Sequence, residues 1–381
     1  MSYVYDKKIF LFGLVFITFI LPGYKLFSQT TKLNNAFNFS QGIVVDSKGN
    51  AFVTGKNNRI IKINEEGKAE LFAGGGRNNK DGKGKDAGFS DTWGIAIDQT
   101  DNLYVTDGNL VRKLTSDGTV STIAGIAKAE VKDGNRETAS FLHLENITID
   151  TKGNIYVTDY APGKDWVPGR ITNSGEYYIR KITPQGIVTT IQNGIEGKLL
   201  LKYPRGVACD NEGNLYVCAS VSHCIKKITP GGIITTVAGQ CDKTIFNSVY
   251  KEGNIVTAVL TNPSGIAINK NGDIYISDDR MNRIIKIGSN KITTVAGCGK
   301  INFSGNIAGA SEQGERDGKA MQAMFHTPMG IAFDKSGNLF IVDGSSRNNS
   351  YIRKLSTDGI VTTFCKHVWN PKTSQYEEAD K

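Results

Sequence analysis

The sequence predicts an all-β fold, a six-bladed β-propeller whose blades are four-stranded antiparallel sheets. Three observations support this prediction. One pattern recurs six times along the 381 residues, each copy holds four short runs rich in Ile, Val, Thr and Tyr, and residues that favour turns separate the runs. Repeats that each contain four strands are typical of sheets arranged around a central axis.

Each copy of the repeat starts with a large apolar residue, which we call the anchor, followed five residues later by glycine or, once, asparagine. The anchors are Phe37, Phe89, Phe141, Leu201, Leu260 and Phe325. The residues five positions later are Gly42, Gly94, Asn146, Gly206, Gly265 and Gly330. Successive anchors are 52, 52, 60, 59 and 65 residues apart, so the core pattern is constant while the connections vary in length.

The second copy shows the order of the four expected strands. They lie within residues 89–98, 102–107, 111–114 and 120–125. The first turn has the form Asp-x-x-Gly-Asn, as in residues 46–50, where Gly supplies a positive φ and Asp bonds back to the turn backbone. Because blades bury both faces against their neighbours, no single copy is expected to fold alone.

The strand sequences resemble NHL repeats. The first strands are of the type Gly-Ile-Ala-Ile-Asp, the second of the type Tyr-Val-Thr-Asp, and the third of the type Arg-Ile-Ile-Lys-Ile. The resemblance covers about residues 37–367 and implies a six-bladed propeller. It implies little about activity, because that family includes both interaction modules and enzymes.

The N-terminus has the three parts of a signal peptide. Lys7 and Lys8 precede an apolar run from Ile9 to Leu21, and a small residue, Ser28, stands at the expected cleavage point. The run is short for a membrane span, which needs about 20 apolar residues. An uncleaved N-terminal anchor is the alternative.

We therefore expect three segments: a signal peptide over residues 1–28, the propeller over 29–367, and a polar C-terminal tail over 368–381. No other segment is apolar enough for a stable membrane span after signal removal, so a secreted or periplasmic location is expected. Export also argues against nucleic acid as the partner. The formal net charge of +8 is compatible with an ordinary solvated surface.

All six cysteines lie in the second half of the chain. They are Cys209, Cys218, Cys224, Cys241, Cys298 and Cys365. An even number in an oxidising compartment permits disulfides, although many pairings are possible. Cys218 and Cys224 flank a short turn and are the first candidate pair.

The strand order assigns the variable loops to one face of the propeller. The first-to-second and third-to-fourth turns are tight and lie on one face, which we call the tight-turn face. The long connections lie on the other, which we call the loop-rich face: 75–88, 126–140, 160–176, 240–259 and 299–324. Long loops on a rigid scaffold usually carry binding function, so we expect the ligand on the loop-rich face.

At the centre of that face, six different side chains are expected at the channel mouth, each just before the conserved glycine or Asn146. These mouth residues are Gln41, Trp93, Glu145, Arg205, Ser264 and Met329. An aromatic ring, a carboxylate and a guanidinium that converge in this way can hold a polar ligand.

Acidic side chains also recur at fixed places. One set lies in the inter-blade loops, at Asp81, Asp133, Glu252 and Asp317, with the neutral Asn193 at the equivalent position of a fifth loop. Another set ends the second strands, at Asp107, Asp159, Asp278 and Asp343. They could form repeated cation sites. The interpretation we favour is structural: the first set caps local turns, and the second bonds to the following turn and the third strand.

Three histidines, His143, His223 and His326, are expected on the loop-rich face. Peptide-amidating lyases, which resemble this fold, hold zinc with histidines from several blades, so the alternative function is a metal-dependent lyase or hydrolase that binds Zn or Ca at the channel mouth. Three separate turn residues are the simpler interpretation. No Gly-x-Ser-x-Gly, His-Glu-x-x-His or phosphate-loop motif occurs.

The sequence thus favours an exported, non-catalytic binding propeller without a cofactor, which recognises a protein or glycan through its loop-rich face. The metal-dependent enzyme remains the alternative, and the identity of the ligand and the oligomeric state stay open.

Overall fold

A computed structural model describes residues 41–378, except for 56–57, 77, 162–175, 192–200, 242–250, 298–313, 345–348 and 371–374. The described residues belong to one compact unit, residues 35–381. The expected signal peptide and the anchor Phe37 lie outside them. None of the helices within the described residues has the length and apolarity needed to cross a membrane.

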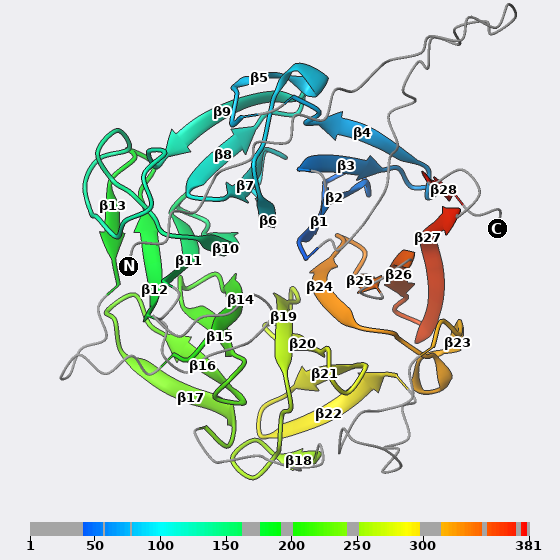
Figure 1. Cartoon of the computed structure of the whole chain (residues 1–381). Helices are drawn as coiled ribbons and strands as arrows, with labels where there is room; N and C mark the ends of the chain where they lie inside the picture. The colour runs from blue at the N-terminus through cyan, green and yellow to red at the C-terminus, as the bar shows by residue number, and fades with distance from the viewer. Residues whose placement is uncertain are drawn as a thin grey trace, which may run out of the picture. The chain divides into compact units, whose positions relative to one another are not determined.

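Six antiparallel sheets follow one another around an axis, which confirms the predicted propeller (Figure 1). Blade 1 contains β1 (Ile43–Val45), β2 (Ala51–Gly55), β3 (Arg59–Ile63) and β4 (Ala69–Ala73). Blade 2 contains β5 (Gly82–Lys83), β6 (Thr92–Ile97), β7 (Leu103–Asp107), β8 (Leu110–Leu114) and β9 (Thr119–Ala124). Blade 3 contains β10 (Leu144–Ile149), β11 (Ile155–Ala161), β12 (Glu176–Ile182) and β13 (Val188–Thr190).

The second half of the ring repeats this arrangement. Blade 4 contains β14 (Pro204–Cys209), β15 (Leu215–Ala219), β16 (Cys224–Ile228) and β17 (Ile234–Gly239). Blade 5 contains β18 (Gly253–Asn254), β19 (Pro263–Ile268), β20 (Ile274–Asp278), β21 (Arg283–Ile287) and β22 (Lys291–Ala296). Blade 6 contains β23 (Gly318–Lys319), β24 (Pro328–Phe333), β25 (Leu339–Gly344), β26 (Asn349–Leu355), β27 (Ile360–Asn370) and β28 (Gln375–Glu378). The 3-10 helices η1 (Gly84–Asp86) and η2 (Ala320–Gln322) lie in loops between blades.

Within each blade, the four main strands pair in sequence order from the axis outward. Blades 2, 5 and 6 add a two-residue edge strand, β5, β18 or β23, from the loop that precedes their first main strand. The innermost strands of neighbouring blades contact one another all the way round, and β24 of blade 6 contacts β1 of blade 1. The described residues therefore close the ring by packing the last blade against the first.

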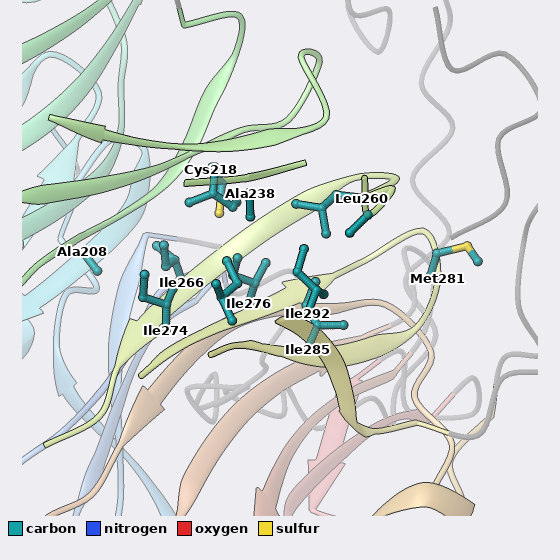
Figure 2. Close-up of a cluster of buried hydrophobic side chains, with 13 residues drawn as sticks. Ala208, Cys218, Ala238, Leu260, Ile266, Ile274, Ile276, Met281, Ile285 and Ile292 are labelled. Atoms are coloured by element: carbon teal, nitrogen blue, oxygen red, sulfur yellow. The ribbon is translucent and has the colours of Figure 1, made fainter. Parts of the chain in front are cut away.

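Apolar side chains from facing blades fill the space between them. Figure 2 shows the cluster between blades 4 and 5, where Cys218 packs with Ile276 and Ile285. Ile276 and Ile285 are fully buried, and complete burial of such a side chain stabilises the fold by about 1.5–3 kcal/mol. Because these clusters combine residues of two blades, the core depends on neighbours, as the repeat predicts.

The first turns have the bonding predicted for them. Asp46 Oδ1 accepts hydrogen bonds from the backbone N–H groups of Lys48 at 2.9 Å and Asn50 at 2.8 Å, and Gly49 has φ of 86°. The same turn recurs at Asp98, Asp150, Asp210 and Asp334, each of which accepts from the asparagine four residues on.

The conserved glycine of the first strand lies against the backbone of the next blade. A Cβ added to Gly94 would lie 2.7 Å from the carbonyl oxygen of Glu145, closer than Cβ atoms approach oxygen in proteins. Thr106 Oγ1 donates to that same carbonyl at 2.9 Å. Glycine is therefore required by a close approach between blades rather than by its φ angle.

Four other copies repeat this approach between a glycine and a carbonyl of the neighbouring blade. Gly42 faces Trp93, Gly206 faces Ser264, Gly265 faces Met329 and Gly330 faces Gln41. In each case the carbonyl belongs to a mouth residue, so the same contact that spaces the blades also fixes the backbone of the channel mouth.

The C-terminal segment departs from the predicted tail over residues 368–381. Strand β27 continues to Asn370 and pairs with β28, with Trp369 opposite Tyr376. Residues 368–370 and 375–378 therefore extend blade 6. The sequence pattern did not show this, because the pair follows the end of the sixth repeat.

The predicted disulfide between Cys218 and Cys224 is wrong. The structure joins Cys224 to Cys241, with Cα atoms 5.2 Å apart, and leaves Cys218 as a buried free thiol. In the register of β15 and β16, Cys224 lies opposite Ala219, and Cys218 lies opposite Ile225. Because successive side chains point to opposite faces of a strand, the two cysteines face different neighbouring blades.

Substitution of Gly94 by alanine should lower the free energy of unfolding by about 1–3 kcal/mol, because the new methyl group must push two blades apart. Gly231→Ala is the matched control, since its added Cβ would meet nothing closer than 3.9 Å. Urea unfolding of both variants measures the effect. Equal stability of the two variants would show that the first-strand spacing tolerates a side chain.

Loss of the disulfide in Cys241→Ser should lower the free energy of unfolding by about 3 kcal/mol, because the bond closes a loop with a sequence separation of 17 residues. Cys209→Ser, which removes a free and partly exposed thiol, should have a much smaller effect. Peptide mapping without reductant should recover Cys224 linked to Cys241. A Cys218–Cys224 peptide would contradict the pairing.

Candidate functional site

Five of the six predicted mouth residues line one pocket at the start of the first strands. The lining residues are Gln41, Glu145, Arg205, Ser264 and Met329, joined by Asn146, Gly265 and Gly330. The pocket has a volume of about 10 Å³, which is room for one water-sized group. The arrangement therefore forms a narrow polar well rather than a deep cleft.

Trp93, the sixth mouth residue, lies beside the well with His143. The two rings pack edge to face, with centroids 5.7 Å apart. Trp93 Nε1 is buried and has no hydrogen-bond partner in the structure. The side chain thus adds an aromatic surface next to the polar group.

Asn146 marks the one copy in which the first strand has no glycine. Its backbone N–H donates to Thr158 Oγ1 at 2.8 Å, and its side-chain oxygen accepts from the backbone N–H of Ile147 at 2.9 Å. Asn146 lines both the well and the central channel. The break in the repeat therefore lies beside Glu145 and is the sequence signal for the asymmetric part of the mouth.

An ion pair spans blades 4 and 5 at the mouth. Arg205 Nη1 lies 2.6 Å from Asp279 Oδ2, and the two side chains are only 15% and 9% exposed. Asn262 also donates to Asp279. Sequence reasoning missed Asp279, although it occupies the position just after the second strand, where the six copies differ from one another.

Glu145 is the second carboxylate of the mouth. The Tyr203 hydroxyl donates a hydrogen bond to it, and burial raises the pKa of the Glu145 carboxyl, while the nearby Arg205 and His143 act in the opposite direction. The carboxylate thus lies in a poorly solvated place but faces a guanidinium that favours its charged form.

Three tyrosines form an aromatic cluster next to Glu145. The rings of Tyr160 and Tyr177 stack with centroids 5.0 Å apart, and the Tyr203 ring stands at 75° to the first and 82° to the second. Sequence reasoning missed this cluster. Tyr160 is at the same variable position of the repeat as Asp279, one residue after the recurrent aspartate, and in blade 3 this position lies within β11.

Tyr203 has an unusual backbone conformation, with φ of 52°. Left-handed φ values are rare for bulky residues and cost about 1–3 kcal/mol where they persist. The Tyr203 carbonyl accepts the backbone N–H of Ser220, which ties this strained residue to the end of β15. This conformational cost is consistent with a need to position the phenol group of Tyr203 next to the Glu145 carboxylate.

Larger spaces occur away from the mouth. The channel along the axis encloses about 260 Å³ between the first strands of all six blades. Cavities of about 590 and 520 Å³ flank the β24–β25 turn on the tight-turn face, which the sequence did not predict. Exposed turns form much of their walls, and Asp46 and Asp334 on those turns already cap their own backbones, so we place the candidate site at the mouth.

The repeated carboxylates have a structural role in blade 2. The fully buried Arg112 reaches Asp107 through Nη1 and Asp81 through Nη2, both at 2.8 Å. Asp81 also accepts from the backbone N–H and the hydroxyl of Thr122. This side chain therefore joins an inter-blade loop to the third and fourth strands.

Blades 3 and 6 repeat this network. Arg180 pairs with Asp159 and Asp133 in blade 3, and Arg353 pairs with Asp343 and Asp317 in blade 6. A structural interpretation thus accounts for the six carboxylates of these three blades.

One detail differs from the expectation for the carboxylates that end the second strands. Asp107 accepts from the backbone N–H groups of Ser90 and Asp91, in the segment after the anchor, rather than from the following turn. In blade 5, Ile285 stands in place of the arginine. Asp278 there accepts from the hydroxyl and backbone N–H of Thr261 and, as expected, from the backbone N–H of Met281 in the following turn.

The three candidate metal ligands lie in separate surroundings. His143 Nδ1 is 3.9 Å from Asp91 Oδ2, His223 Nδ1 is 2.6 Å from the Thr261 carbonyl, and His326 Nδ1 is 3.4 Å from Thr327 Oγ1. Among the residues that the structure describes, no group of three or more His, Cys, Asp or Glu side chains is arranged to hold a metal ion. The fold therefore does not bring this triad together.

Two protein-family models match parts of this chain. A model of the NHL repeat matches residues 260–287, and a model of the teneurin NHL domain matches residues 307–375. The predicted resemblance to NHL repeats is thereby confirmed. The Arabidopsis thaliana protein SUPPRESSOR OF QUENCHING 1, chloroplastic, is 25% identical over 279 residues, which are 67% of this chain. This chain spans 25% of the length of that relative.

Solved structures with the same architecture include two from Bacteroides thetaiotaomicron. A protein of unknown function has a TM-score of 0.58 at 17% identity, and the match covers 84% of this chain and 69% of that one. A protein described as an auxiliary nutrient binding protein has a TM-score of 0.56 at 15% identity, covering 86% and 69%. At these identities the likeness shows the fold.

Replacement of Arg112 by methionine should lower the free energy of unfolding by about 3–5 kcal/mol, because it leaves the fully buried Asp107 without its ionic partner. Lys113→Met is the control, since Lys113 only lies over the Tyr104 ring, 5.6 Å from its centroid. Guanidinium unfolding compares the two. A loss below about 1 kcal/mol for Arg112→Met would contradict the structural role of the pair.

Proposed function

We propose that this chain is an exported, non-catalytic binding propeller that recognises a protein or glycan ligand through its loop-rich face, with the channel mouth as the centre of contact. The observation that carries the proposal is the contrast between repeated and unrepeated side chains. The carboxylates that end the second strands of blades 2, 3 and 6 are bound in buried ion pairs, whereas the mouth contains unlike side chains from several blades.

The composition of the mouth suits recognition. It places the carboxylate Glu145, the paired Arg205 and the indole of Trp93 on one rigid ring of first strands. A few polar groups with aromatic surface beside them are typical of ligand sites. The backbone of Glu145 and Trp93 is fixed by contacts between blades and the Arg205 side chain by its ion pair, so little ordering is needed when a ligand binds.

Two further considerations support a binding role in an exported protein. The likeness in fold to a protein described as an auxiliary nutrient binding protein indicates that this architecture can serve binding. Residues 1–28 have the charged, apolar and small-residue parts of a signal peptide. The separate surroundings of His143, His223 and His326 give the metal-dependent lyase or hydrolase no support in geometry.

The double variant Trp93→Ala plus Arg205→Ala should reduce ligand capture by at least about tenfold, which corresponds to about 1.4 kcal/mol. A glycan array and a pull-down from the native environment, both with the purified protein, identify the ligand and measure the loss. Lys48→Ala plus Lys335→Ala, on the tight-turn face, is the matched control and should bind like the wild type.

Circular dichroism should show the same β content for the wild type and both double variants. Capture that is unchanged by the mouth substitutions but lost in the control would place binding on the opposite face. Turnover of a captured ligand by the purified protein would contradict a purely binding role.

A further inference from the structure

We propose that the ligand presents a primary ammonium group to the well at the channel mouth, where it contacts the carboxylate of Glu145. This inference rests on the proposed binding function and specifies the chemistry that the mouth selects. An amine of a free amino sugar, an amino acid or an exposed lysine would supply the same group.

Among the described residues, the mouth carries two carboxylates, Glu145 and Asp279, and one guanidinium, that of Arg205. Arg205 Nη1 lies 2.6 Å from Asp279, so the positive and negative charges of that pair largely cancel at a distance. A cation next to Glu145 therefore gains more from this carboxylate than it loses to the paired Arg205.

The size of the well selects the head group. A volume of about 10 Å³ admits one water-sized group, so a primary ammonium fits and a trimethylated one does not. An ammonium has three hydrogen-bond donors. Glu145, Gln41 and Ser264 line the same well, and their side chains include a carboxylate, an amide oxygen and a hydroxyl, which are acceptor groups.

The tyrosine cluster lies beside Glu145 but is not part of the lining of the well. Tyr203 stands nearly perpendicular to the stacked Tyr160 and Tyr177, and Tyr177 is only 5% exposed. Aromatic rings attract a cation through their quadrupole, so the cluster favours an ammonium held at Glu145. A neutral ligand gains nothing from this attraction.

Binding should depend on pH through Glu145. The titratable and charged groups that face it are His143, Tyr160, Tyr177, Tyr203 and Arg205. Burial raises the pKa of the Glu145 carboxyl, so it takes up a proton at a higher pH than an exposed glutamate. Because only the carboxylate attracts an ammonium strongly, affinity should fall as the pH is lowered through that pKa, and binding should displace a proton from Glu145.

The test compares three small probes with three carbon atoms and different head groups, propylammonium, propanol and propionate, by NMR titration of the purified protein. We expect propylammonium to bind at least about tenfold more tightly than propanol, and propionate to bind least. Glu145→Gln should reduce propylammonium binding to the level of propanol. The glutamine oxygen can still accept from the Tyr203 hydroxyl, so the variant keeps the local packing.

Tyr203→Phe is the matched second variant, because it retains the ring but removes the hydroxyl that donates to Glu145. It should keep the preference of propylammonium over propanol. A wild-type protein that binds propanol as well as propylammonium, that binds no probe, or that keeps its preference in Glu145→Gln would overturn the inference.

These failures differ from failure of the proposed function. A natural ligand that is captured through Trp93 and Arg205 but carries no amine would overturn the ammonium inference alone. Capture that is unchanged by the mouth substitutions would overturn both.

Discussion

The close approach between the first strand of each blade and the backbone of the next is the constraint on which the rest of the structure depends. In five blades a glycine without a side chain lies directly against a carbonyl of the neighbour. Side-chain hydroxyls on the second strands, such as Thr106, bond the same carbonyls. Blade spacing, channel width and the position of the mouth residues follow from this one contact, because cores packed this closely do not deform gradually.

The candidate site lies where the repeat changes. Asn146 replaces glycine next to Glu145, and the position one residue after the recurrent aspartate carries Tyr160 in blade 3 and Asp279 in blade 5. The architecture depends on the residues that all copies share, and the proposed binding site consists of residues that differ between copies. A rigid ring built from equal parts can thus hold an asymmetric set of side chains with little loss of order, as functional sites on regular scaffolds require.

The architecture could be predicted from the sequence because six copies report the same strands and turns, and the position of five mouth residues followed from strand direction alone. Contacts between parts of the chain that the repeat does not relate to one another could not be predicted in this way. The Asp279 partner of Arg205 comes from another blade, and the pairing of Cys224 with Cys241 depends on which face of β16 a side chain occupies. Tyr203 could not be anticipated, because its left-handed backbone is imposed by tertiary contacts rather than by its residue type.

The junction between blade 6 and blade 1 differs from a ring held by a shared strand. Among the described residues, side-chain packing such as that of Val53 and Ile61 with Phe340 and Ile352 holds the two ends of the ring together. In the described residues no backbone ladder crosses any boundary between blades, but at this boundary the chain also does not run directly from one blade into the other. Local opening should therefore begin there, and amide hydrogens that border the seam should exchange with solvent sooner than those between blades 3 and 4. A propeller of this design can open transiently at one blade boundary while the opposite half, which contains the mouth tyrosines, keeps its geometry.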